Sequence, residues 1–128
     1  MNNRSVSQKL SVVSYNFRGY SQGCTLLQEL CNSNTYDLIY CQELWLVPDN
    51  MHKILKFNNN YVGYGVSAME QAVEQGFLRG RPWGGTAILV KESLVKLCSE
   101  IHTFDRVVTL TIADIILINV YMPYDDLN

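Results

Sequence analysis

The chain has 128 residues, 48% hydrophobic and 17% charged, which is enough apolar surface for one folded domain and excludes a disordered segment. Ten lysines and arginines against twelve aspartates and glutamates give a formal charge of -2, which excludes a protein that coats nucleic acid through a general basic surface. The N-terminus is polar and no stretch approaches the ~20 apolar residues of a membrane span, so we expect an intracellular protein, nuclear or cytoplasmic, that is not secreted and has no membrane partner.

The first 42 residues predict a strand, a helix and a second strand. Leu10 to Phe17 is apolar and rich in β-branched and aromatic residues, and Arg18 and Gly19 then predict a turn. A helix follows with Ser21 as its N-cap, and Asp37 to Gln42 predicts the second buried strand. The apolar face of the helix is formed by residues at helical spacing: Cys24, Leu27, Leu30 and Cys31.

The rest of the chain predicts mostly strands. A weaker helical pattern covers Pro48 to Phe57, a short helix covers Ala68 to Gln75, and a glycine-rich loop covers Phe77 to Gly85. Strands are expected over Tyr61 to Ser67, Thr86 to Lys91, Val95 to Ile101, Val107 to Ala113 and Ile115 to Met122, with a turn around Asp114. This order predicts a layered α/β arrangement with a mixed sheet, formed by one domain over residues 10–128 after a polar tail over residues 1–9.

The four cysteines form no CxxC pair and have no suitably placed histidines, so a structural zinc site is not expected. Cys24, Cys31 and Cys41 lie at apolar positions of the predicted helix and strand and are expected to be small core residues. Reduced thiols fit an intracellular compartment.

Two polar residues follow the predicted strands at the points where these strands end. Asn16 ends the first strand and Glu43 follows the second, and two parallel strands joined by a crossover helix bring their carboxyl ends to one edge of a sheet. A carboxylate there is a ligand that Mg²⁺ or Mn²⁺ prefers, and the amide could bind a phosphate oxygen or orient Glu43. On spacing alone, the plainer interpretation is favoured, in which Asn16 satisfies a turn and Glu43 caps a strand at the surface.

Other side chains could contact a phosphate or a base. Tyr121 ends the last predicted strand, where its hydroxyl could donate to a phosphate, although such a tyrosine is commonly a core aromatic with a polar tip. Three arginines lie in predicted loops, where they are either phosphate contacts or solvated surface: Arg18, Arg79 and Arg81. Three loop aromatics could stack on bases or plug the ends of the sheet: Trp45, Trp83 and Tyr124.

Four segments in order resemble the endonuclease/exonuclease/phosphatase superfamily. Ser14 to Gly19 (SYNFRG) resembles its first-strand motif, and Asp37 to Leu46 resembles the second motif, a strand that ends in Gln-Glu. Gly80 to Val90 resembles the glycine-rich turn and strand of non-LTR retrotransposon endonucleases, and Ile118 to Pro123 resembles the strand with the phosphate-contacting tyrosine. The resemblance covers roughly residues 10–126 and is best to these retrotransposon endonucleases.

The resemblance implies the N-terminal half of a four-layer α/β/β/α sandwich, of the α+β kind, in a Mg²⁺-dependent phosphodiesterase. The complete domain would be a retrotransposon endonuclease that acts on DNA. Glu43 would bind the Mg²⁺ or Mn²⁺, Asn16 would hold the scissile phosphate, and Tyr121 would stabilise its charge. Arg18 and Tyr124 would contact substrate, although the related endonucleases commonly have an asparagine in the place of Tyr124.

Two later motifs of the superfamily do not occur in the 128 residues: the Gly-Asp-Phe-Asn strand and the Ser-Asp-His segment. His52 and His102 match no motif and do not replace them. We therefore expect weak Mg²⁺ binding, no nicking activity by this chain alone, and an uncovered apolar face near Val107 to Tyr121. The alternatives are a phosphatase or sphingomyelinase-like phosphoesterase of the same superfamily, or a non-catalytic remnant that acts as a folded or partner-binding module.

Overall fold

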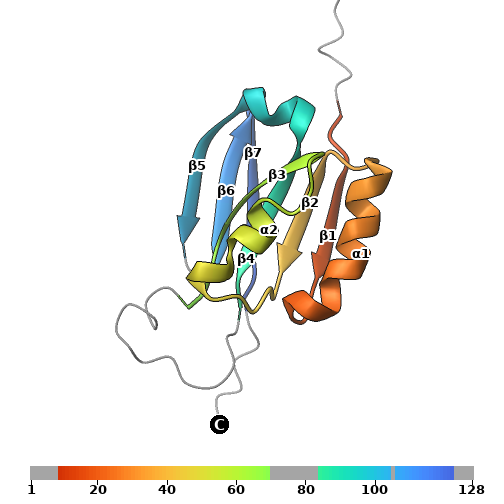
Figure 1. Cartoon of the computed structure of the whole chain (residues 1–128). Coiled ribbons are helices and arrows are strands. Elements are labelled where there is room, and N and C mark those ends of the chain that lie inside the picture. The colour runs from red at the N-terminus through yellow and green to blue at the C-terminus, as the bar shows by residue number, and fades with distance from the viewer. Residues whose placement is uncertain (1–8, 70–83, 105, 123–128) are drawn as a thin grey trace, which may run out of the picture.

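The computed structural model describes residues 9–69, 84–104 and 106–122 (Figure 1). Strands predominate, and the longest helix lies between the first two strands. The elements in chain order are β1 (Val12–Asn16), α1 (Tyr20–Ser33), β2 (Leu38–Gln42), the 3-10 helix η2 (Pro48–Asn50), α2 (His52–Leu55), β3 (Tyr61–Val66), β4 (Thr86–Lys91), the 3-10 helix η3 (Glu92–Leu97), β5 (Cys98–Phe104), β6 (Val107–Ile112) and β7 (Ile115–Val120).

The strands form two sheets. The first sheet has the order β1-β2-β4-β3 and is mixed, because β1 and β2 are parallel while the other pairs are antiparallel. The second sheet has the order β5-β6-β7 and is antiparallel. The helix α1 connects β1 to β2, so the carboxyl ends of both strands lie at the same edge, where their arrowheads point in Figure 1.

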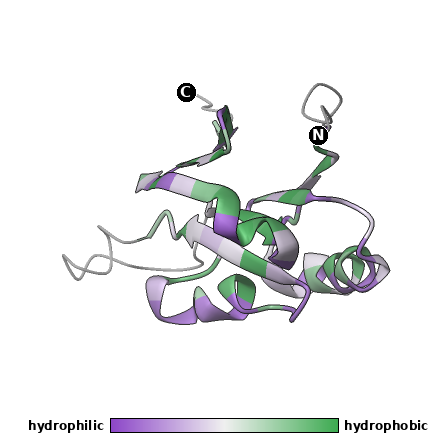
Figure 2. Ribbon diagram, turned by 90° about the horizontal axis from the view of Figure 1, so that it is seen from above, coloured by the Kyte–Doolittle hydropathy of each residue, from purple (hydrophilic) through white to green (hydrophobic). Residues whose placement is uncertain are grey.

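Alternating side chains of the central strand β4 separate two cores. Ala87 and Leu89 pack on one face of the first sheet with residues of α1 and α2, whereas Ile88 and Val90 pack on the other face against the second sheet. Viewed from above, α1 and α2 lie on one side of the stacked sheets (Figure 2). The predicted α/β class with two sheets packed face to face is confirmed, and the described residues provide three layers: helices, first sheet and second sheet.

The outer face of the second sheet is apolar and exposed in the part of the chain that the structure describes. Along β7, Leu117 and Asn119 are buried between the sheets while the alternate residues point outward. Exposed large apolar residues on β5 and β7 are Ile101, Phe104, Ile115, Ile116, Ile118 and Val120. The expected uncovered apolar face is therefore present.

The boundaries of α1 differ from the prediction. The N-cap residue is Gly19 instead of Ser21, and it makes no side-chain capping bond. Gly19 has a φ of 106°, and a Cβ there would lie 2.7 Å from Cε3 of Trp45, so the close approach of the indole requires glycine. The buried stripe of α1 consists of Gly23, Leu27 and Cys31, whereas the expected core residue Cys24 is only half-buried.

Two further predictions are wrong in detail. Residues 92–97 form η3, so the strand expected over Val95 to Ile101 begins only at Cys98. Leu94 and Val95 pack against the core between the sheets as one face of this short helix, and this packing overrides the strand preference of a β-branched residue. The helix expected over Pro48 to Phe57 divides into η2 and α2. The helix expected over Ala68 to Gln75 and most of the loop over Phe77 to Gly85 lie outside the described residues.

Candidate functional site

Asn16 and Glu43 meet at the edge shared by β1 and β2. The Asn16 Nδ2 donates a hydrogen bond of 2.9 Å to Oε2 of Glu43, as the parallel strand geometry predicts. The Oδ1 of Asn16 also accepts a bond of 3.1 Å from the backbone N–H of Arg18. Asn16 therefore satisfies the turn after β1 and orients the carboxylate at the same time.

Tyr121 reaches the same carboxylate from the second sheet. The nearby Glu43 side chain, with partial burial, raises the pKa of Tyr121, while the charge of Arg106 opposes the rise. The phenol is therefore a neutral donor at physiological pH. The three residues predicted to be catalytic thus lie together, although they come from two sheets.

The backbone around Glu43 has an unusual conformation. The φ angles of Arg18, Glu43 and Trp45 are 55°, 54° and 56°, values that residues other than glycine seldom adopt. Hydrogen bonds from both sides hold this turn: Gly19 N–H donates to Glu43 O at 2.8 Å, and Trp45 N–H donates to Gly84 O at 2.8 Å. Such a cluster is typical of functional sites, where the surrounding structure compensates for the strain.

A buried polar group that the sequence analysis missed lies next to the site. Asn119 is 2% exposed and bonds to Gln42 and to two backbone carbonyls of the first sheet. The sequence contains a signal for it, because an asparagine at an inward position of an alternating strand needs partners. The hydroxyl of Thr86, opposite Gln42 on β4, is buried without a hydrogen-bond partner among the described residues.

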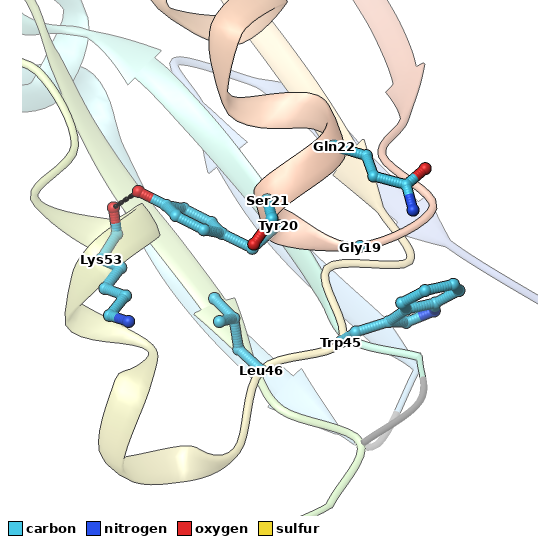
Figure 3. A pocket seen from close by; sticks show the side chains of 7 residues that line it. All are labelled: Gly19, Tyr20, Ser21, Gln22, Trp45, Leu46 and Lys53. Carbon is cyan, nitrogen blue, oxygen red and sulfur yellow. Dashed lines mark hydrogen bonds between the residues drawn. The ribbon is translucent and has the colours of Figure 1, made fainter. Parts of the chain in front are cut away.

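A pocket of about 210 Å³ lies beside the turn that carries Glu43. In Figure 3, Gln22 and Trp45 lie on one side of it and Lys53 on the other. Lys53 Nζ is 5.9 Å from the ring centroid of Tyr20, and the Tyr20 hydroxyl donates to the Lys53 carbonyl at 3.5 Å. The residues that line the pocket are Gly19, Tyr20, Ser21, Gln22, Trp45, Leu46 and Lys53, and they include no carboxylate.

The donor set at Glu43 fits a hard divalent cation that keeps most of its water ligands. The described residues contain no group of three His, Cys, Asp or Glu side chains that could enclose a metal ion. Glu43 offers one carboxylate with amide and hydroxyl groups around it, and Mg²⁺ usually binds through one or two carboxylates plus water and phosphate.

The other predicted residues are less informative. Arg18 is exposed, and its expected contact with substrate stays a prediction, whereas Tyr124, Arg79, Arg81 and Trp83 lie outside the described residues. His52 is exposed on α2, and His102 is exposed on β5 at 4.0 Å from Glu100. The described residues also include no helix of the length and hydrophobicity needed to cross a membrane.

Comparison of the chain with known proteins gives structural likeness only, because no protein-family model and no curated protein matches it. A 3′ phosphatase, NExo, from Neisseria, solved with a product DNA hairpin, matches 88% of the chain with a TM-score of 0.64 at 18% identity, and the match covers 41% of that structure. A 3′-5′ exonuclease, NExo, from Neisseria meningitidis gives a TM-score of 0.63 at 18% identity, with the same coverage of both chains. An AP endonuclease from Archaeoglobus fulgidus matches 90% of the chain and 42% of its own length, with a TM-score of 0.59 at 18% identity.

The chain spans about two fifths of the length of these structures. At 18% sequence identity, the structural likeness shows a shared arrangement of strands and helices. The chain therefore has the α/β fold of these phosphatase, exonuclease and AP endonuclease structures, in agreement with its resemblance to the endonuclease/exonuclease/phosphatase superfamily.

Proposed function

We propose that this chain supplies the metal-binding and phosphate-binding part of a Mg²⁺-dependent phosphodiesterase that acts on DNA. The observation that carries this proposal is the contact of Asn16, Glu43 and Tyr121 at one edge of the two sheets. The finer proposal, an endonuclease of the non-LTR retrotransposon type, rests on the sequence motifs around these residues and around Gly84 and Gly85. Since the chain spans about two fifths of the matched structures, the complete activity is part of the proposal.

Each of the three side chains has a role in phosphodiester hydrolysis. Glu43 would hold Mg²⁺ through one carboxylate oxygen, and the bound cation would polarise a phosphate oxygen. Asn16 keeps the carboxylate oriented through its 2.9 Å hydrogen bond. Tyr121 remains protonated, so its hydroxyl can donate to a phosphate oxygen as negative charge develops there.

The pocket beside the site offers a place for the DNA strand next to the scissile phosphate. Lys53 brings a positive charge, and Trp45 brings an aromatic surface on which a base can stack. Arg18 is exposed on the same edge. These contacts are local, as the formal charge of -2 requires.

Manganese titration by NMR tests the metal site. We expect Mn²⁺ to broaden the signals of Asn16, Glu43 and Tyr121 first. Glu43→Gln should remove this broadening, whereas the control Glu29→Gln, on the exposed face of α1, should leave it unchanged. Equal broadening in the Glu43→Gln protein would refute the proposed metal site.

A DNA titration tests the substrate. With Mg²⁺ present, a short duplex should shift the signals of Gln22, Trp45 and Lys53, and Lys53→Ala should weaken this response. No shift at these residues would refute the DNA path. Because the motifs that would supply the catalytic aspartate and histidine do not occur in the 128 residues, we expect no plasmid nicking by this chain, and nicking that Glu43→Ala abolishes would contradict this expectation.

A second candidate is a non-catalytic module that binds a partner. The described residues contain no group of three His, Cys, Asp or Glu side chains that could hold a metal ion, which favours it, as does the exposed apolar face of the second sheet. Metal titration separates the two functions, because a partner-binding module does not require a Mn²⁺ site at Glu43.

A further inference from the structure

A buried amide lies between the two sheets, beside the apolar core that their facing strands form. Asn119 points inward from β7, as Leu117 does two residues earlier, and Val108 and Leu110 of β6 line the same core. An amide at 2% exposure is costly to bury unless all its hydrogen-bonding groups have partners. A leucine would fill similar space without this requirement, so the asparagine calls for a reason beyond packing.

All three hydrogen bonds of this amide cross from the second sheet to the first. Nδ2 of Asn119 donates to the carbonyl of Ala87 on β4 at 2.8 Å and to the carbonyl of Cys41 on β2 at 3.2 Å. Its Oδ1 accepts from Nε2 of Gln42 at 2.9 Å. Apolar contacts between sheets tolerate small displacements, but three directional bonds from one side chain define one position of β7 over β2 and β4.

These bonds lie directly beneath the candidate site. Gln42 precedes Glu43, and Asn119 precedes Tyr121 by two residues. Gln42 also donates to Oγ of Ser14 at 3.0 Å, and Ser14 precedes Asn16 by two residues on β1. Ser14, Gln42 and Asn119 thus lie on the same three strands whose carboxyl ends carry Asn16, Glu43 and Tyr121.

We propose that Asn119 is a positioning residue, which fixes the second sheet over the first so that the Tyr121 hydroxyl reaches the Glu43 carboxylate. Its importance for catalysis rests on the proposed function, whereas its effect on geometry does not. The backbone supports this role, because Tyr121 N–H donates to the carbonyl of Arg106 at 3.1 Å and so continues the pairing of β6 and β7 beyond the last strand residue. A shift of β7 at Asn119 is therefore passed to Tyr121.

Nuclear Overhauser effects between the Tyr121 ring and the Glu43 side chain test the proposal without metal or DNA. We expect Asn119→Ala to abolish this cross-peak while the signals of α1, on the opposite face of the first sheet, stay in place. The matched control is Leu117→Ala on the same inward face, which removes packing but no hydrogen bond and should keep the cross-peak. A retained cross-peak in Asn119→Ala, or its loss in Leu117→Ala as well, would overturn the proposal.

A milder variant decides the matter if Asn119→Ala does not fold. Gln42→Met keeps the side-chain length of this half-buried residue but removes its bonds to Asn119 and Ser14. Since the two bonds of Asn119 to backbone carbonyls remain, the cross-peak should weaken, and an unchanged cross-peak would overturn the proposal. In these variants, added Mn²⁺ should still broaden the signal of Asn16 but no longer that of Tyr121.

If Mn²⁺ broadens neither signal while the wild-type protein shows the cross-peak, the proposed metal site has failed and the positioning role of Asn119 has not.

Discussion

Replacement of Gly23 by alanine tests how closely α1 packs under the site. Alanine in a helix interior is favoured over glycine by about 1 kcal/mol, so propensity alone predicts stabilisation. In this chain, however, a Cβ at Gly23 would lie 2.5 Å from Cγ and 2.9 Å from Cβ of Phe17. Phe17 is 2% exposed and its ring packs against Tyr15 at a centroid distance of 4.9 Å, so the ring has no free space to move into.

The steric cost therefore exceeds the gain in propensity. Overpacking in a rigid core costs about 1–3 kcal/mol, and the contact with the Cβ of Phe17 places this site at the upper end, for a net destabilisation of roughly 2 kcal/mol. Urea unfolding at constant m measures it. Thr25→Ala on the exposed side of α1 is the control and should be slightly stabilising.

A combined change separates the clash from other causes. Phe17→Leu shortens the opposing side chain, so the Gly23→Ala/Phe17→Leu double variant should lose less stability than the two single changes added together. If Gly23→Ala were as stable as Thr25→Ala, the close contact between α1 and Phe17 would be refuted. Because Phe17 follows Asn16, the substitution should also weaken the Asn16–Glu43 contact, which NMR can follow.

Three more predictions concern a buried hydroxyl, two buried thiols and the exposed face of the second sheet. Thr86→Val should stabilise the fold by about 1 kcal/mol in urea unfolding, because it removes a buried hydroxyl without a partner, and a loss of stability would show that this hydroxyl is bonded. Burial raises the pKa of Cys31 from 9.0 to about 12 and raises that of Cys41 too, so the folded state favours both neutral thiols. The contribution of these thiols to the free energy of unfolding is fully present below about pH 9 and is lost as the pH rises toward 12. The free energy of unfolding in urea should therefore be lower at pH 10 than at pH 8, and the Cys31→Ala/Cys41→Ala variant should show a smaller difference. Ile116→Lys with Ile118→Lys, at positions 70% and 57% exposed, should reduce self-association in size-exclusion chromatography without loss of stability, and a wild-type chain that stays monomeric at high concentration would contradict this.

The sequence predicts most of the fold because the strands are strongly apolar and separated by clear turn residues. Thr86 to Lys91 is predicted with the observed bounds, and the strand expected over Ile115 to Met122 is observed over Ile115–Val120. The strand expected from Val95 fails because a local β preference does not reveal that η3 packs against the sheets. Ser21 fails as an N-cap because propensity takes no account of the indole of Trp45 over Gly19.

The site could be predicted only in part, for a related reason. Asn16 and Glu43 are brought together by one strand-helix-strand unit, whose geometry follows from local sequence. The approach of Tyr121 depends on how one sheet lies over the other, which no local pattern determines. The role of Asn119 was missed because its partners are 77, 78 and 32 residues away in the chain.

The separation of these contacts along the chain has a consequence for the order of folding. Asn16 and Glu43 are 27 residues apart, so their contact closes a short loop and can form as soon as the first strand-helix-strand unit has left the ribosome. The Tyr121 contact closes a loop almost three times as long and must wait for the second sheet to dock. A nascent or clipped chain would thus carry the Asn16–Glu43 contact without the Tyr121 hydroxyl, and the proposed site would be completed last.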